Sequence, residues 1–396
     1  MINNLKIFGF RFVIIFVIGF VLTLSFPFYF LPNIGKFIFP FFEYCNQFWA
    51  SFLHLNESAY LKVISDSTGL YLHLITLLII SLTGSLFWSV FQKNSKNAKL
   101  KKWVYIGVSY YLALILFKYG FDKVFKHQFY LPEPNTLYTP MGDLSKDILF
   151  WSTMGSSYSY SVFSGLIEVF PAVLLLFRKT RLIGGLIAMV VMINVVMLNF
   201  GFDVSVKIFS LFLLGLTLIV ISPYRRALII FFSGQKPIQL NLECHNFKKK
   251  KQLIIYAVVK SVIIGLILFE SLGGYFETNN FNDDNFPRPY LHGAYTNVIP
   301  NQSIKRVFFH RKQFFIIQNQ QDKFMSYGLQ FSEDLTQLIL TDYEGGHFVL
   351  KYKVNTDNDI SIQGVLQQDT INVTTKKENL KDLPLLKNNS FNWSFD

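Results

Sequence analysis

Seven long apolar stretches are the feature that most constrains the fold of this 396-residue chain. A helix of about 20 apolar residues crosses a hydrocarbon core of about 30 Å. Only 16% of the residues are charged, against roughly 25% in soluble domains. The sequence therefore predicts a polytopic α-helical membrane protein. Its expected spans are approximately residues 10–30, 69–91, 103–125, 159–177, 182–200, 205–223 and 253–271.

Lysine and arginine in the short loops predict the orientation of the chain, because such residues collect on the cytoplasmic side. KNSKNAKLKK (93–102), RKTR (178–181), YRR (224–226) and KKKK (248–251) fall on one side if the N-terminus is cytoplasmic. We therefore expect a multi-pass protein of the cytoplasmic (inner) membrane, with a cytoplasmic N-terminus and an extracytoplasmic C-terminal domain. The net charge of +12 then reflects contact with anionic lipid and requires no nucleic acid.

A second domain follows the last apolar stretch. FVLKYKV (348–354) alternates apolar and polar residues, which is the period of a strand with one buried face. Gly345 and Gly346 suit a tight hairpin between LILTDY (338–343) and this strand. Several such segments at short spacing predict an antiparallel β sandwich or barrel. It is expected either to pack as a plain domain or to bind a ligand or partner.

Ionisable residues inside the apolar stretches are the candidate functional residues. Lys118 and Asp122 are four residues apart and therefore share one helix face. Glu168 shares a stripe with small residues such as Gly165 and Ala172. Membrane helices approach one another closely along such stripes, so Glu168 is expected to face the bundle rather than lipid.

Further polar residues are expected at the same outer level of the membrane. A charged residue at the centre of a span costs about 2.5–3.5 kcal/mol on insertion scales, so a group of them needs a reason. We expect them to converge in one polar site; the alternative is ion pairs that only fix helix register. The candidate catalytic residues are Glu168, Lys118 and Asp122, and the candidate ligand-binding residues are Asn199, Asp203, Lys207 and Tyr119.

Several chemistries find no support in the sequence. No pattern of metal ligands is present, so no metal site is expected. Haem ligation would need paired histidines at matched depth, whereas His73 only begins one span and His127 ends another. Cys45 and Cys244 fall on opposite sides of the membrane and cannot form an intramolecular disulfide.

Residues 103–223 carry four short motifs in a fixed order. They are KYGFDK (118–123), GLIE (165–168), LIGGLIAM (182–189) after the RKTR turn, and NFGFDVSVK (199–207). In these motifs the segment resembles the DoxX family of small four-helix membrane proteins. The resemblance implies a four-helix core and redox chemistry near the quinone pool, because related DoxD-type proteins form a thiosulfate:quinone oxidoreductase.

The expected organisation has four parts. They are residues 1–102, with two membrane helices and an outer loop; 103–223, a DoxX-like four-helix core; 224–274, a basic cytoplasmic segment and the last membrane helix; and 275–396, an extracytoplasmic β-domain.

Two functions of different class remain open. In the first, the chain is a membrane oxidoreductase subunit: a quinone enters from the bilayer, Glu168 or Asp122 relays protons, and Lys118 with Lys207 attracts an anionic donor such as thiosulfate. Buried carboxylates and amines have the adjustable proton affinities that this chemistry needs. In the second, the chain is a non-catalytic scaffold whose helices anchor the β-domain, and this domain binds a periplasmic protein partner or envelope lipid.

Overall fold

The protein, seen in a computed structural model, forms two compact units. The helical unit comprises Met1–Val124 and Phe163–Phe281, and the barrel unit comprises Phe125–Val162 and Asn282–Asp396. The structure describes residues 2–24, 28–32, 35–56, 63–92, 98–234, 250–299, 303–355 and 359–387. Cys244 and residues 93–97 and 248–249 of the predicted basic loops lie outside these ranges.

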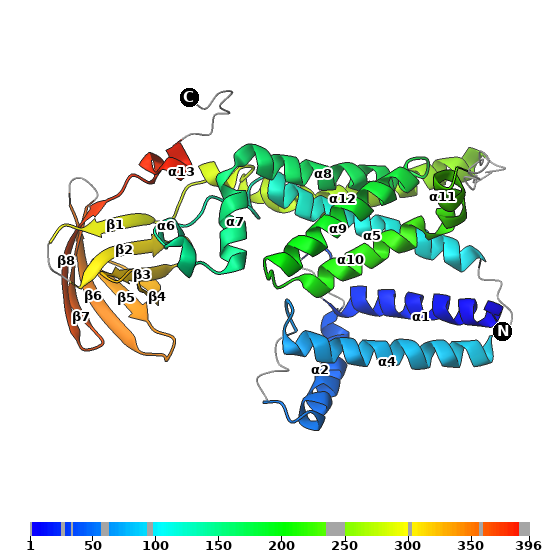
Figure 1. The fold of residues 1–396 in the computed structure, drawn as a ribbon, viewed down its shortest axis with the longest axis horizontal. Coiled ribbons are helices and arrows are strands. Elements are labelled where there is room, and N and C mark those ends of the chain that lie inside the picture. The colour runs from blue at the N-terminus through cyan, green and yellow to red at the C-terminus, as the bar shows by residue number, and fades with distance from the viewer. Residues whose placement is uncertain are drawn as a thin grey trace. The chain divides into compact units, whose positions relative to one another are not determined.

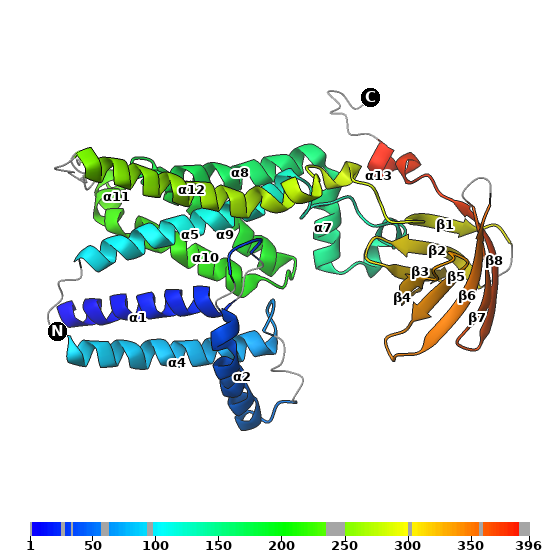
Figure 2. The same cartoon turned by 180° about the vertical axis from the view of Figure 1, so that it is seen from behind.

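Seven helices among the described residues are long and apolar enough to cross a membrane, which confirms the predicted number of spans, although the first ends at Thr23 and not near residue 30. In a hydrocarbon environment a helix satisfies its own backbone hydrogen bonds, and these sequences therefore fold this way. The helices are α1 (Ile2–Thr23), α4 (Thr68–Phe91), α5 (Ala98–Val124), α8 (Tyr158–Leu176), α9 (Arg181–Gly201), α10 (Lys207–Ile221) and α12 (Lys250–Thr278) (Figures 1 and 2). The expected domain boundary at residue 275 thus falls inside α12.

The core of the helical unit contains buried residues of α5, α8, α9 and α10, and the same cluster includes Leu77 of α4 and Ile267 of α12. Ile115 of α5, Ala172 of α8 and Ala188 of α9 are completely buried there. The N-terminal helix joins the same core, because Phe20 of α1 stacks on Phe212 of α10 with ring centroids 3.7 Å apart. After α10 the chain continues through η2 (Ser222–Tyr224) into the short helix α11 (Arg225–Phe232).

The segment between α1 and α4 contains a helix that the sequence did not predict. This helix, α2 (Gly35–Phe52), has Pro40 in its interior and is amphipathic. Both views of the fold show α2 running across α1 and α4, which themselves lie side by side (Figures 1 and 2). Polar residues such as Lys36 and Glu43 lower the mean hydropathy of α2, so the sequence does not have the pattern of a membrane span there.

The barrel unit contains a closed antiparallel barrel in which every strand pairs with its neighbours in sequence and β1 pairs with β8. Thr341 faces His347 across the predicted hairpin. The strands are β1 (Gly293–Asn297), β2 (Ile304–His310), β3 (Phe314–Asn319), β4 (Phe324–Phe331), β5 (Gln337–Thr341), β6 (His347–Val354), β7 (Ile360–Leu366) and β8 (Asp369–Lys377). The sequence had left a sandwich or a barrel open, and the structure has the barrel.

Large apolar side chains fill the inside of the barrel. Seventeen inward-facing residues, among them Tyr295, Phe309 and Tyr352, form one buried cluster, and each is at most 8% exposed. A barrel of eight strands is only just wide enough to be filled by side chains or to hold one small ligand. Because these side chains are buried against one another, the interior is a packed core rather than a ligand-binding cavity.

Residues 125–162 belong to the barrel unit, and the part around α6 (Pro134–Leu137) and Tyr138 packs against the outside of the barrel. The same residues also form η1 (Met141–Asp143) and α7 (Lys146–Ser156). The Tyr138 ring lies 5.9 Å from that of Phe308 and 4.4 Å from the guanidinium of Arg306. Gln318, which is fully buried, donates to the Tyr138 carbonyl oxygen at 3.3 Å. The barrel unit also includes η3 (Asp283–Asn285), η4 (Leu380–Asp382) and α13 (Pro384–Lys387).

Candidate functional site

Helices α5 and α8 cross where two glycines face each other. A Cβ atom at Gly165 would lie 2.4 Å from the Gly120 carbonyl oxygen, and one at Gly120 would lie 3.0 Å from the Gly165 carbonyl oxygen. Only glycine allows two membrane helices to come this close. The predicted stripe of small residues is therefore the contact face of α8, and Glu168 is 4% exposed, facing protein as predicted.

Glu168 pairs with Lys123 of α5. The Lys123 Nζ atom donates to Glu168 Oε2 at 2.7 Å, and both residues are buried. Lys123 also lies 5.4 Å from the centre of the Tyr119 ring, one turn earlier on α5. Breaking such a buried pair leaves one uncompensated charge, which destabilises proteins by about 3–5 kcal/mol. The pair therefore fixes α5 against α8.

Asp122 reaches a different helix. The hydroxyl of Tyr275 on α12 donates a hydrogen bond to Asp122 Oδ1. Asp122 also lies within electrostatic range of Glu168 and Tyr119. These four residues and Lys123 thus form one polar cluster between α5, α8 and α12.

Glu270 of α12 holds the turn that follows α1. Its carboxylate accepts the backbone N–H groups of Tyr29, of Phe30 at 2.9 Å and of Leu31 at 3.0 Å. Lys118 Nζ lies 3.8 Å from Glu270 Oε1, and Glu270 is 1% exposed. Sequence reasoning missed Glu270; the available signal was a lone carboxylate at the end of an apolar span, opposite the lysine of another.

The start of α10 is the third polar location. Asp66 accepts the backbone N–H groups of Lys207 at 2.8 Å and Ile208 at 3.1 Å, so it caps this helix as N-terminal acidic residues do. Lys207 Nζ lies 2.7 Å from Asp203 and 3.9 Å from Asp66. The Asp203 side chain is 78% exposed. Asn199 is buried on α9, and its Nδ2 atom has no hydrogen-bond partner within the described ranges.

The predicted site residues are therefore divided among separate contacts. Glu168, Asp122 and Tyr119 lie together in the α5–α8–α12 cluster with Lys123 and with Tyr275, a partner that the sequence did not indicate. Lys118 instead pairs with Glu270. Asp203 and Lys207 pair with each other at the start of α10.

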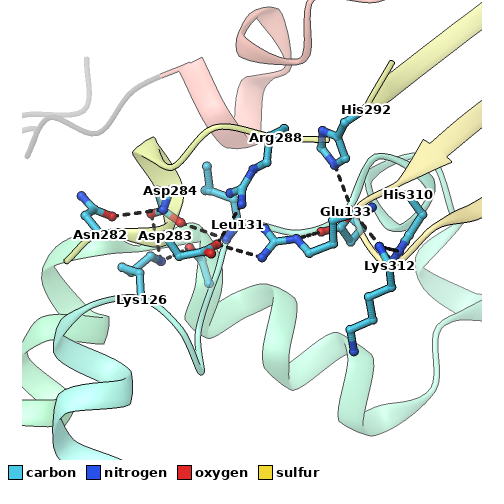
Figure 3. A network of polar contacts seen from close by, with 12 residues as sticks. Lys126, Leu131, Glu133, Asn282, Asp283, Asp284, Arg288, His292, His310 and Lys312 are labelled. Atoms are coloured by element: carbon cyan, nitrogen blue, oxygen red, sulfur yellow. Dashed lines mark hydrogen bonds and ion pairs between the residues drawn. The ribbon is translucent and has the colours of Figure 1, made fainter. Parts of the chain in front are cut away.

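The barrel unit contains a second polar network, drawn in Figure 3, which the sequence did not indicate. At its centre Glu133 forms an ion pair with the Arg311 guanidinium. Glu133 Oε2 lies 3.1 Å from His292 Nε2 and 3.8 Å from His310 Nε2. Glu133 directly precedes α6, whereas His310 is the last residue of β2, Arg311 follows it and His292 directly precedes β1. This carboxylate therefore attaches α6 to the ends of these two strands.

The same network continues into the residues that follow α12. Arg311 Nη1 donates to Asp283 Oδ2 at 2.8 Å, and Arg288 Nη1 donates to the same oxygen at 3.1 Å. Lys126, which is fully buried, lies 3.3 Å from Asp284 Oδ2 and donates to the Gly155 carbonyl oxygen at 2.5 Å. The stretches that follow α5 and α12 are thus tied to each other and to the barrel (Figure 3).

Burial and neighbouring charges both shift the pKa values of residues in this network. Burial alone would raise the pKa of Glu133, but the hydrogen bond with His292 and the charges of His310 and Arg311 lower it to about 2. Burial lowers the pKa of His310, assisted by the positive charges of His292, Lys312 and Arg311, although Glu133 acts in the opposite direction. Burial also lowers the pKa of Lys126, although Asp284 opposes this effect. The described part of the chain holds no group of three or more His, Cys, Asp or Glu residues arranged to bind a metal.

The long apolar helices and the C-terminal barrel define a multi-pass membrane protein with an added β-domain. The chain is 31% identical over 137 residues to the uncharacterized protein YwoB of Bacillus subtilis (strain 168), a match covering 32% of this chain and 80% of that protein. The chain therefore belongs to the same family as YwoB. No family model matches the chain, and no solved structure matches it.

Proposed function

We propose that the chain is a non-catalytic membrane scaffold that presents the barrel unit at the extracytoplasmic face of the inner membrane for a protein partner. The observation that carries this proposal is the saturation of the buried charges. Glu270 accepts three backbone N–H groups and faces Lys118, and Glu168 is paired with Lys123. Charged side chains that are paired in this way hold helices together and are not free to exchange protons with a substrate.

The barrel offers its partner one uncovered face. Tyr138 and its neighbours cover the outside of β1–β3. On β5–β8, by contrast, the outward-pointing residues include exposed Val349 and Val365, the lysines at 351, 353 and 376, and no carboxylate. The barrel has no free strand edge to extend, since β1 and β8 pair. A partner with an acidic surface is the complement of this face.

Site-specific photo-crosslinking in native membranes tests the uncovered face. A photoreactive amino acid at Val349 is expected to give one discrete protein adduct, and the same probe at Leu335, in the β4–β5 turn, is the control. The Lys351→Glu, Lys353→Glu double variant should reduce the Val349 adduct at least fivefold while the barrel stays folded. No discrete adduct at Val349, or an adduct insensitive to charge reversal, would count against this surface.

A quinone-linked redox subunit is the second candidate, supported by the DoxX resemblance and by one hollow. The hollow, of about 530 Å³, lies beside α12 and is lined by Tyr29, Leu268, Phe269, Leu272, Gly273, Phe276 and Glu277. The Tyr29 hydroxyl shares a hydrogen bond with Glu277, which raises the pKa of Tyr29. Aromatic walls with one proton-sharing pair at the rim suit the ring of a lipid-soluble quinone.

Mass analysis of lipids extracted from the chain, purified in mild detergent, separates the two candidates. The scaffold predicts no quinone at a stoichiometric level. The redox candidate predicts about one quinone per chain, lost in Phe269→Ala and Phe276→Ala and retained in the matched lipid-facing variant Val262→Ala. Stoichiometric quinone with this pattern would overturn the scaffold assignment.

A further inference from the structure

Helix α2 has three distinct faces. With 3.6 residues per turn, Phe42, Asn46 and Ala50 fall on one face, and all are buried. A second face carries only aromatic residues, which are between 55% and 88% exposed: Phe37, Phe41, Tyr44, Phe48 and Phe52. The third face is polar and exposed, and it carries Lys36, Glu43, Gln47 and Ser51. The exposed apolar residues thus form a continuous stripe rather than a scatter.

The buried face attaches α2 firmly to α4. Trp49 Nε1 donates to Thr76 Oγ1 at 3.0 Å, and Asn46 Nδ2 donates to the Gly69 carbonyl oxygen at 3.4 Å. The Phe42 ring stacks on the imidazole of His73 with centroids 4.2 Å apart. His73 is itself held by Thr23 of α1, with His73 Nε2 2.7 Å from the hydroxyl oxygen. These contacts fix the rotation of α2, so the aromatic and polar faces have defined directions.

The contacts also fix the depth of α2. Its partners Gly69, His73 and Thr76 all lie in the first turns of α4, within about 12 Å of the start of that helix at a rise of 1.5 Å per residue. α4 is long and apolar enough to span the membrane. A helix that runs across α4 at this depth lies where acyl chains meet headgroups, which is also where aromatic residues concentrate in membrane proteins.

We propose that α2 is an interfacial helix whose aromatic face inserts into the leaflet surrounding the start of α4, with its polar face toward water. A helix of this kind buries its apolar side about 5–10 Å into the boundary between headgroups and acyl chains. The occupant of the aromatic face is thus lipid. Protein on one side, lipid below and water above account for all three faces, and the aromatic stripe carries no charge that a water-facing partner would need.

Cysteine accessibility tests this arrangement in the full chain. In a background with Cys45 and Cys244 replaced by serine, single cysteines are placed at Phe41 or Phe48 on the aromatic face and at Gln47 or Ser51 on the polar face. The chain is reconstituted in phosphatidylcholine–phosphatidylglycerol vesicles and treated with a membrane-impermeant maleimide. Labelling is normalised to that in SDS. We expect positions 47 and 51 to react at least tenfold faster than positions 41 and 48.

Dilution distinguishes lipid from protein as the cover. At one chain per vesicle, protection of positions 41 and 48 persists if lipid covers them and disappears if a second copy does. Equal labelling of the two faces, or protection lost on dilution, would overturn the proposal. Two positions on each face guard against one substitution that fails to fold.

Discussion

Both units of the molecule use carboxylates to hold distant segments together, but the carboxylates are paired differently in the two units. Between the long helices, Glu168 and Glu270 have separate partners: Glu168 has Lys123, and Glu270 has one backbone turn and Lys118. In the barrel unit the carboxylates share partners, since Arg311 bridges Glu133 and Asp283. Histidines join only the second arrangement.

The difference reflects the surroundings of each unit. Inside a membrane no water can compensate a charge, so each carboxylate needs partners that remain in place. In the barrel unit water is nearby, and a branched network tolerates a change of protonation at one member. We therefore expect the ion pairs of the helical unit to stay in place, and the polar network of the barrel unit to weaken in acid.

The largest effect is expected for Glu270→Ala. This change removes the acceptor of the Tyr29, Phe30 and Leu31 N–H groups and the carboxylate that faces Lys118. Removal of one partner from a buried ion pair costs about 3–5 kcal/mol. The free energy of unfolding, measured by SDS titration in mixed micelles, should fall by about that amount. Val262→Ala on the same helix is the control, because that side chain is exposed, and an equal loss there would show that position 270 is not special.

Acid should weaken the barrel unit by about 3 kcal/mol through Glu133. The folded pKa is about 2 against an ordinary value of 4.5, and each unit corresponds to about 1.36 kcal/mol. Because the folded pKa is depressed, this stabilisation is complete above pH 4.5 and is lost as the pH falls toward 2. The lowered pKa of His310 adds a smaller loss that starts below its ordinary value of 6.5.

Hydrogen exchange of the β2 amides at different pH measures both steps. In Glu133→Gln the change between pH 4.5 and 2 should shrink to the part that Asp283 contributes, because Arg311 and Arg288 outweigh burial and lower the pKa of that carboxyl. His310→Asn should remove only the step that begins near pH 6.5. If the exchange rates of the wild-type β2 amides show no such steps from pH 7 to 2, the network does not stabilise the barrel unit through its titration.

A smaller loss, about 1–3 kcal/mol, is expected for Gly165→Ala. The added methyl group would meet the Gly120 carbonyl oxygen at 2.4 Å and force α5 and α8 apart, as overpacking does. Gly107→Ala in α5 is the matched control, because its Cβ would meet no atom within 4 Å. The difference in apparent melting temperature between the two variants reports the cost of separation. Equal melting temperatures would mean that α5 and α8 do not depend on this approach.

The smallest effect is expected at the surface of the barrel. Lys305 and Asp322 form an ion pair at 2.6 Å, but their side chains are 33% and 35% exposed. Exposed pairs contribute about 0–1 kcal/mol. Lys305→Ala should therefore shift the melting temperature of the barrel unit by at most about 4 °C, which is what a free energy of up to about 1 kcal/mol gives for a domain of this size. A shift as large as that of Gly165→Ala would remove the contrast between buried and exposed pairs.

Local patterns were sufficient to predict most of the fold. Apolar length predicted the seven spans, and alternation around Leu350 and Tyr352 predicted strands with one buried face. The small-residue stripe through Gly165 predicted the direction of Glu168. α2 was missed because its apolar residues occupy only part of its circumference, and neither a span nor a strand has that pattern.

The polar partners could not be predicted because their contacts join distant parts of the chain. The backbone N–H group of Arg311 donates to Glu133 at a separation of 178 residues, and that of Tyr29 to Glu270 at 241. Backbone donors such as those of Tyr29 leave no trace in a sequence. The sequence places Lys118 as a cation inside an apolar span, but only the packing of α12 shows that Glu270 is its partner.

A double-mutant cycle on Lys123 and Glu168 tests most directly whether the buried charges are structural. We expect Lys123→Met and Glu168→Leu each to lower the free energy of unfolding by about 3–5 kcal/mol, and the double variant to regain most of that loss because an apolar pair replaces the ion pair. Additive losses, or single variants that unfold like the wild type but no longer retain quinone, would contradict the scaffold account.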